Sequence, residues 1–149
     1  MSPHPPHVAV VGAGECGDEE AARAAEVGRR LAEAGAVVVC GGLGGVMEAA
    51  CRGARAAGGT TVGLLPDDNR ARANPHLTVA LATGLGEIRN TLIVRDADAV
   101  VAIAGGYGTL SEIAFALRIG KRVIGLATWD VRGVEAASDP ADAVARALR

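Results

Sequence analysis

The chain has 149 residues, close to the usual size of one domain, so we expect a single domain over residues 1–149 with residues 1–6 as a disordered or extended tail. Its 15 Lys and Arg and 17 Asp and Glu give a net charge of −2, which supplies no broad positive field for nucleic acid or an anionic membrane. Only Tyr107, Phe115 and Trp129 are aromatic, so the predicted core consists of small aliphatic side chains.

No apolar run approaches the roughly 20 residues that span a bilayer. Residues 1–7 lack the basic and apolar regions of a signal peptide, which favours a cytoplasmic protein. The three cysteines show no CxxC spacing, and the histidines have no metal-ligand spacing. Neither a disulfide framework nor a metal site is therefore predicted.

Short apolar runs alternate with helical patterns along the whole chain. In chain order we expect a strand at 7–11, a helix at 18–34, a strand at 36–40, a helix at 45–57, a strand at 60–65, a weak strand at 76–80, a helix at 83–95 capped by Thr83, a strand at 98–103, a helix at 110–118, a strand at 122–126 and a helix at 139–148. Residues 66–75 form a polar, turn-rich connection.

Several of these strands are apolar on both faces and are separated by helices, which indicates parallel neighbours joined by crossover connections. The predicted fold is an α/β domain with a Rossmann-like, doubly wound parallel sheet in three α/β/α layers. Ligands of such sheets bind beyond the carboxyl ends of the strands. We therefore expect the site among four loops, at residues 12–17, 41–45, 66–75 and 105–109.

The first two loops are rich in glycine, and we expect Gly12, Gly14, Gly41 and Gly42 to contact a ligand. Residues 12–17 satisfy the GxGxxG pattern of dinucleotide sites. The second predicted strand, however, ends without the acidic residue that binds a ribose hydroxyl in those sites. A tight turn that leaves room for a smaller ligand is the favoured interpretation, and dinucleotide binding is the alternative.

The loop at residues 105–109 joins a buried strand to a helix through three glycines. Backbone amides freed at such a helix start, together with a threonine hydroxyl, are suited to bind a phosphate group. We expect this phosphate-binding turn to be formed by Gly105, Gly106, Tyr107, Gly108 and Thr109.

Two charged residues are candidates for chemistry beside that turn. Glu112 lies three residues after Thr109, so it either completes a capping box or faces the ligand. Arg89 shares a predicted helix face with Leu85 and Leu92, where a guanidinium needs a snorkelling path or an anionic partner. Both alternatives are open for each residue.

Three segments together resemble the Lonely Guy (LOG) superfamily, once mislabelled lysine decarboxylases. These segments are Cys40-Gly41-Gly42-Leu43-Gly44-Gly45-Val46-Met47-Glu48, Gly86-Glu87-Ile88-Arg89-Asn90 and Gly105-Gly106-Tyr107-Gly108-Thr109-Leu110-Ser111-Glu112. The last matches the signature Pro-Gly-Gly-x-Gly-Thr-x-x-Glu except that Ala104 replaces the proline. Within the superfamily the chain is similar to a small bacterial branch that includes proteins likened to the molybdenum cofactor carrier protein of algae.

The resemblance implies a function in two forms. LOG enzymes hydrolyse the N-glycosidic bond of nucleoside 5′-monophosphates, with an arginine and the signature glutamate essential, and these map onto Arg89 and Glu112. The enzymes' Met-His-x-Arg-Lys segment is here Gly86-Glu87-Ile88-Arg89-Asn90, so a histidine and a cation are lost and Asn90 becomes a candidate ligand contact. Glu87 is expected to lower the local potential for a dianionic phosphate.

Two functional hypotheses follow. The favoured one is a protein that binds a phosphorylated nucleotide-like or pterin ligand, such as a nucleoside monophosphate or the molybdenum cofactor, and that needs no other cofactor. The alternative is a LOG-type phosphoribohydrolase. In either case we expect a small phosphorylated ligand, no nucleic acid or membrane partner, and a homodimer or higher homo-oligomer.

Overall fold

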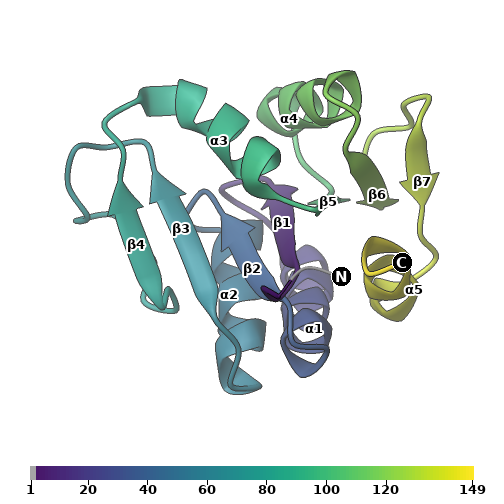
Figure 1. Ribbon diagram of the computed structural model, residues 1–149, viewed down its shortest axis with the longest axis horizontal. Coiled ribbons are helices and arrows are strands. Elements are labelled where there is room, and N and C mark those ends of the chain that lie inside the picture. The colour runs from purple at the N-terminus through teal and green to yellow at the C-terminus, as the bar shows by residue number, and fades with distance from the viewer. Residues whose placement is uncertain (1–2) are drawn as a thin grey trace.

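A computed structural model describes residues 3–149. Seven parallel strands form one sheet in the order β4-β3-β2-β1-β5-β6-β7 (Figure 1). The strands are β1 (His7–Gly12), β2 (Val37–Cys40), β3 (Thr61–Leu65), β4 (Val79–Ala82), β5 (Ala99–Ile103), β6 (Arg122–Leu126) and β7 (Val134–Ala136). The reversal of strand order at β1 and β5 brings their carboxyl ends together, where ligands of open α/β sheets bind.

Helices cover both faces of this sheet. They are α1 (Asp18–Glu33), α2 (Val46–Ala56), α3 (Arg89–Asp96), α4 (Tyr107–Arg118) and α5 (Pro140–Ala147), with a short 3₁₀ helix η1 (Gly86–Ile88) before α3. One core cluster joins α1, α2 and α5 to one face, and a second joins α3 and α4 to the other (Figure 1). The predicted three-layer, Rossmann-like fold is confirmed.

The central strands have their predicted character. Every residue of β5 is buried, as are residues 8–11 of β1. Alternate side chains of both strands enter opposite clusters, so each strand must be apolar on both faces. This explains why the apolar runs, rather than any alternating pattern, mark the strands.

The region between β3 and α3 differs from the prediction. The fourth strand lies at Val79–Ala82 rather than 76–80, and α3 begins at Arg89 rather than after Thr83. The Thr83 hydroxyl donates to the Leu65 carbonyl at 2.6 Å and accepts from the Leu85 amide at 3.2 Å. Thr83 therefore fastens a loop to the end of β3 instead of capping a helix.

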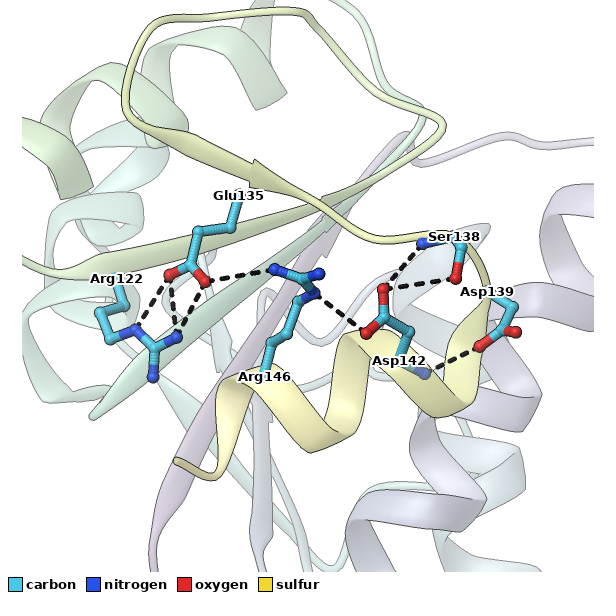
Figure 2. A network of polar contacts seen from close by, with 6 residues as sticks. All are labelled: Arg122, Glu135, Ser138, Asp139, Asp142 and Arg146. Atoms are coloured by element: carbon cyan, nitrogen blue, oxygen red, sulfur yellow. Dashed lines mark hydrogen bonds and ion pairs between the residues drawn. The ribbon is translucent and has the colours of Figure 1, made fainter.

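The short edge strand β7 was not predicted. Figure 2 shows that its Glu135 contacts Arg122 of β6 and Arg146 of α5. Glu135 accepts hydrogen bonds from Arg122 at 2.8 to 3.0 Å and lies 3.7 Å from Arg146. Arg146 also donates to Asp142, whose amide donates to the helix-capping Asp139. Contacts between side chains distant in sequence thus hold β6, β7 and α5 together. A strand of two half-buried residues and one exposed residue gives no periodic signal in the sequence.

At the amino-terminal end, residues 1–2 of the predicted tail lie outside the described residues. The Pro6 carbonyl accepts a hydrogen bond from the Val37 amide at 2.8 Å, so the segment before β1 is tied to β2. In the part of the chain that the structure describes, no helix has the length and apolar character required to cross a membrane.

Candidate functional site

A cavity of about 340 Å³ opens where the carboxyl ends of β1 and β5 meet the starts of α3 and α4. We call it the phosphate pocket, after the ligand group that the sequence predicts for it. Most of the predicted site residues line it: Gly12, Gly14, Gly41, Arg89, Asn90, Gly106, Gly108, Thr109 and Glu112. Segments far apart in the sequence are therefore brought to one place by the topology of the sheet.

Three predicted residues lie elsewhere. Gly42 donates its amide to Cys40 Sγ at 3.3 Å and accepts from the Asn74 amide at 2.9 Å, so it shapes the loop behind the pocket. Gly105 lines a separate, open hollow, and Tyr107 lines a second cavity between α3 and α4. The loop at 66–75 contributes no lining residue and instead supports residues 41–45 through Asn74.

Four lining residues carried no chemical signal in the sequence. Val10, Val11, Ala13 and Met47 complete the wall of the phosphate pocket. Their side chains have no titratable or charged group, so only their position at the strand ends and at the start of α2 brings them into the site.

The turn before α4 exposes backbone amides to the pocket. The first hydrogen bond of the helix runs from the Leu110 amide to the Gly106 carbonyl at 3.0 Å, so the amides that precede Leu110 have no acceptor within the helix. A Cβ built on Gly106 or Gly108 meets no atom within 4 Å, which leaves open space beside this backbone. The positive end of the helix dipole points to the same place.

Gly105 allows this turn to form. Its φ of +97° lies in the left-handed region, and a Cβ there would come within 2.2 Å of Thr109 Oγ1. Thr109 is 3% exposed and packs over this glycine. Of the two alternatives for Glu112, the capping box is wrong. The helix α4 begins at Tyr107, so Thr109 lies inside its first turn, and no side chain caps this helix.

Arg89 is held by carbonyl groups rather than by an anion or a path to solvent. It is 7% exposed, and its guanidinium donates to the Leu64 carbonyl at 2.8 Å, to the Gly41 carbonyl at 3.4 Å and to Asn90 Oδ1. A Cβ on Gly41 would come within 2.8 Å of Nη2, so glycine is required for this placement. Because a guanidinium has more N–H groups than these bonds use, Arg89 keeps donors for a ligand.

Burial changes the acid–base behaviour of this pair. It lowers the pKa of Arg89, an effect that nearby Glu112 opposes. It raises the pKa of Glu112 from 4.5 to about 7, with Arg89 acting in the opposite direction. Among residues 3–149 the two side chains form no ion pair. A carboxyl group that titrates near neutral pH thus stands beside the phosphate pocket.

An aromatic pair that the sequence did not reveal lies next to the turn. The rings of Tyr107 and Trp129 stack with centroids 5.8 Å apart, and Trp129 Nε1 donates to the Gly106 carbonyl at 3.1 Å. Trp129 comes from the segment after β6, and no local motif connects it to residues 105–109. It braces the predicted phosphate-binding turn from outside the pocket.

Comparison with known proteins identifies the family. The profile of the SLOG cluster4 family matches residues 5–148, almost the entire chain. The chain belongs to this family. The resemblance to the LOG superfamily seen in the sequence is thereby confirmed.

Solved structures agree with this assignment. The molybdenum cofactor binding protein from Rippkaea orientalis aligns with a TM-score of 0.93 and 35% identity over 97% of this chain and 96% of that chain. The molybdenum cofactor carrier protein of Chlamydomonas reinhardtii aligns with a TM-score of 0.86 and 31% identity over 97% of both chains. This SLOG cluster4 protein therefore represents a LOG-like branch that resembles molybdenum cofactor carriers.

A curated relative represents the enzymes of the superfamily. The rice (Oryza sativa subsp. japonica) protein named "Probable cytokinin riboside 5′-monophosphate phosphoribohydrolase" is 34% identical over 115 residues. The match covers 72% of this chain but only 47% of the rice protein, so the two differ considerably in length.

Proposed function

We propose that this protein binds a small phosphorylated ligand with a heterocyclic ring, of the nucleotide or pterin class, with its phosphate in the phosphate pocket. The observation that carries the proposal is the meeting of the α4 amides, Thr109 and the buried Arg89 around one open space. Each charge-assisted hydrogen bond to a phosphate contributes roughly 1.5 to 3 kcal/mol. A few such bonds supply a large part of the affinity for a small ligand.

The molybdenum cofactor is one candidate ligand within this class. The relatives from Rippkaea and Chlamydomonas are named for binding or carrying it, and both match over nearly their whole length. The cofactor contains a pterin and a phosphate, the two groups that the proposal requires. Mass spectrometry of small molecules that copurify with the protein tests this candidate directly.

Calorimetric titration tests the phosphate pocket. We expect nucleoside 5′-monophosphates to bind and the matching nucleosides to bind far more weakly. Gly106→Val places its side chain in open space beside the turn and should weaken only the monophosphates. Gly17→Val is the matched control, because that glycine also has open space but lies outside the pocket. Equal affinity for monophosphate and nucleoside would refute the proposal.

Glu112 supports a second candidate, a phosphoribohydrolase. A carboxyl group with a pKa of about 7 can donate or accept a proton at neutral pH, and the rice relative is named for this reaction. In this candidate Glu112 handles a proton or stabilises positive charge on the ribose, while Arg89 orients the substrate.

Chromatography separates the two candidates. AMP and related monophosphates are incubated with the protein, and free base is measured. Base release that Glu112→Gln abolishes would favour the hydrolase and refute a purely carrier role. Saturable binding without release would refute the hydrolase.

We also propose that the protein forms homo-oligomers through the surface of β4, η1 and α3. Large apolar side chains are exposed there: Val79, Leu81, Leu85, Ile88 and Leu92, with Ile88 69% exposed. Light scattering coupled to size-exclusion chromatography should give a mass above one chain. Ile88→Lys should reduce that mass without changing the circular dichroism spectrum, and a monomeric wild-type protein would contradict the proposal.

A further inference from the structure

A second cavity, of about 570 Å³, lies between α3 and α4; we call it the ring cavity. Its walls share Asn90, Gly108 and Glu112 with the phosphate pocket, so the two cavities adjoin. A ligand whose phosphate occupies the first cavity has room for its remaining part in the second.

Aromatic side chains form part of the ring cavity. Tyr107 and Phe115 line it, and Tyr107 is held in place by its stacking on Trp129. Tyr107 is nevertheless 82% exposed, so much of its ring is free for a ligand. Aromatic side chains bind planar heterocycles by stacking, largely without regard to which base is present.

Three polar side chains of this cavity, those of Ser111, Thr91 and Glu87, offer hydrogen-bond acceptors to a ligand. The Ser111 hydroxyl donates to the Gly108 carbonyl at 2.8 Å, and the Thr91 hydroxyl donates to the Ile88 carbonyl at 2.7 Å. With their protons used inside the protein, both oxygens offer lone pairs. Glu87 adds a carboxylate, and it lines this cavity but not the phosphate pocket.

The position of Glu87 changes its expected role. The sequence suggested that Glu87 weakens phosphate binding, but in the structure Glu87 lines the ring cavity and not the phosphate pocket. A carboxylate binds two adjacent N–H donors at once and is repelled by an acceptor nitrogen. Guanine and pterins present such a pair of donors in their shared 2-amino-4-oxopyrimidine edge, whereas adenine presents one donor beside an acceptor.

We propose that the ring cavity holds the heterocycle of the ligand and that Glu87 selects rings with a 2-amino-4-oxopyrimidine edge. This inference rests on the proposed function, because the phosphate must first be anchored beside α4. Tyr107 supplies stacking for any planar ring, and Glu87 distinguishes among rings by their hydrogen-bonding edge. The substrate class is thus guanine nucleotides and phosphorylated pterins rather than adenine nucleotides.

The test uses calorimetric titrations of the full chain with GMP, IMP and AMP, with each mixture checked by chromatography for free base. IMP matches GMP except that it lacks the 2-amino group. We expect GMP to bind on the order of ten-fold more tightly than IMP or AMP, the effect of one good two-point contact. Glu87→Gln should remove this preference by weakening GMP, while AMP should bind at least as tightly as it binds the wild type, because the variant no longer repels the acceptor nitrogen of adenine.

Two further variants separate the contributions. Glu15→Gln, an exposed carboxylate outside both cavities, should retain the full GMP preference. Tyr107→Leu should weaken all three nucleotides by a similar factor, because stacking does not depend on the ring edge. A GMP preference that persists in Glu87→Gln would overturn the assignment of Glu87.

The outcomes also distinguish this inference from the proposed function. If the three nucleotides bind equally and Gly106→Val weakens them all, the ring selection is refuted but the phosphate pocket stands. If no monophosphate binds, both proposals fail. If the GMP preference is lost in Glu87→Gln but kept in Glu15→Gln, both proposals are supported.

Discussion

The raised pKa of Glu112 makes the stability of the protein depend on pH. The folded-state pKa is about 7 against an ordinary value of 4.5, because burial disfavours the charged carboxylate. Unfolding therefore releases a proton between these pH values, and the stability present below pH 4.5 is lost as the pH rises through 7. At 1.36 kcal/mol per pH unit, the loss is at most about 3 kcal/mol above pH 7.

Glu112→Gln keeps the shape of the side chain but cannot ionise, so it removes this penalty. We expect the variant to gain up to about 3 kcal/mol over the wild type at pH 8 and little at pH 4.5. Urea unfolding followed by circular dichroism at several pH values measures the difference. Glu15→Gln, which changes an exposed carboxylate, is the control and should follow the wild type. A difference between Glu112→Gln and the wild type that stays constant from pH 4.5 to 8 would refute this reasoning.

Three further substitutions test other parts of the structure. Gly41→Ala puts a Cβ within 2.8 Å of Arg89 Nη2, so it should displace the guanidinium. Calorimetry should then show an affinity for monophosphates that is lower by about ten-fold if one charge-assisted bond is lost. The control Gly17→Ala should leave that affinity unchanged. Gly105→Ala combines a φ of +97° with a clash against Thr109, so it should lower the free energy of unfolding by more than about 1 kcal/mol. An unchanged midpoint of urea unfolding would contradict the described turn. Glu135→Gln weakens the partly exposed contacts to Arg122 and Arg146, so it should lower the free energy of unfolding by about 1 kcal/mol or less. Because salt screens ionic contacts, this difference from the wild type should be smaller in high salt.

Several parts of the candidate site were predictable from local sequence. The glycines at 105, 106 and 108 follow a fully apolar strand and precede the helix predicted at 110–118, and this order alone indicates a turn with exposed amides. Arg89 and Glu112 were singled out by their positions and then by resemblance, and the structure places both at the same pocket. Their role in binding or catalysis stays a prediction until the titrations are made.

Other parts depended on contacts between distant segments. Trp129 braces the turn through a hydrogen bond to Gly106 across 23 positions, and Glu87 lies in the ring cavity because η1 precedes α3 at that edge. The capping-box alternative for Glu112 failed because α4 begins at Tyr107, before Thr109, where Gly105 with a positive φ lets the turn form.

The sequence by itself determined the alternation of strands and helices, since apolar runs and helical periodicity are local properties of the chain. It also determined the parallel sheet, since strands apolar on both faces need helices on both sides. Only the tertiary structure decided that Arg89 is held by backbone carbonyls and stands near Glu112 without pairing with it. The reason is that burial and hydrogen bonding at the site come from β1, β2, β3, α3 and α4 together, and no single segment specifies them.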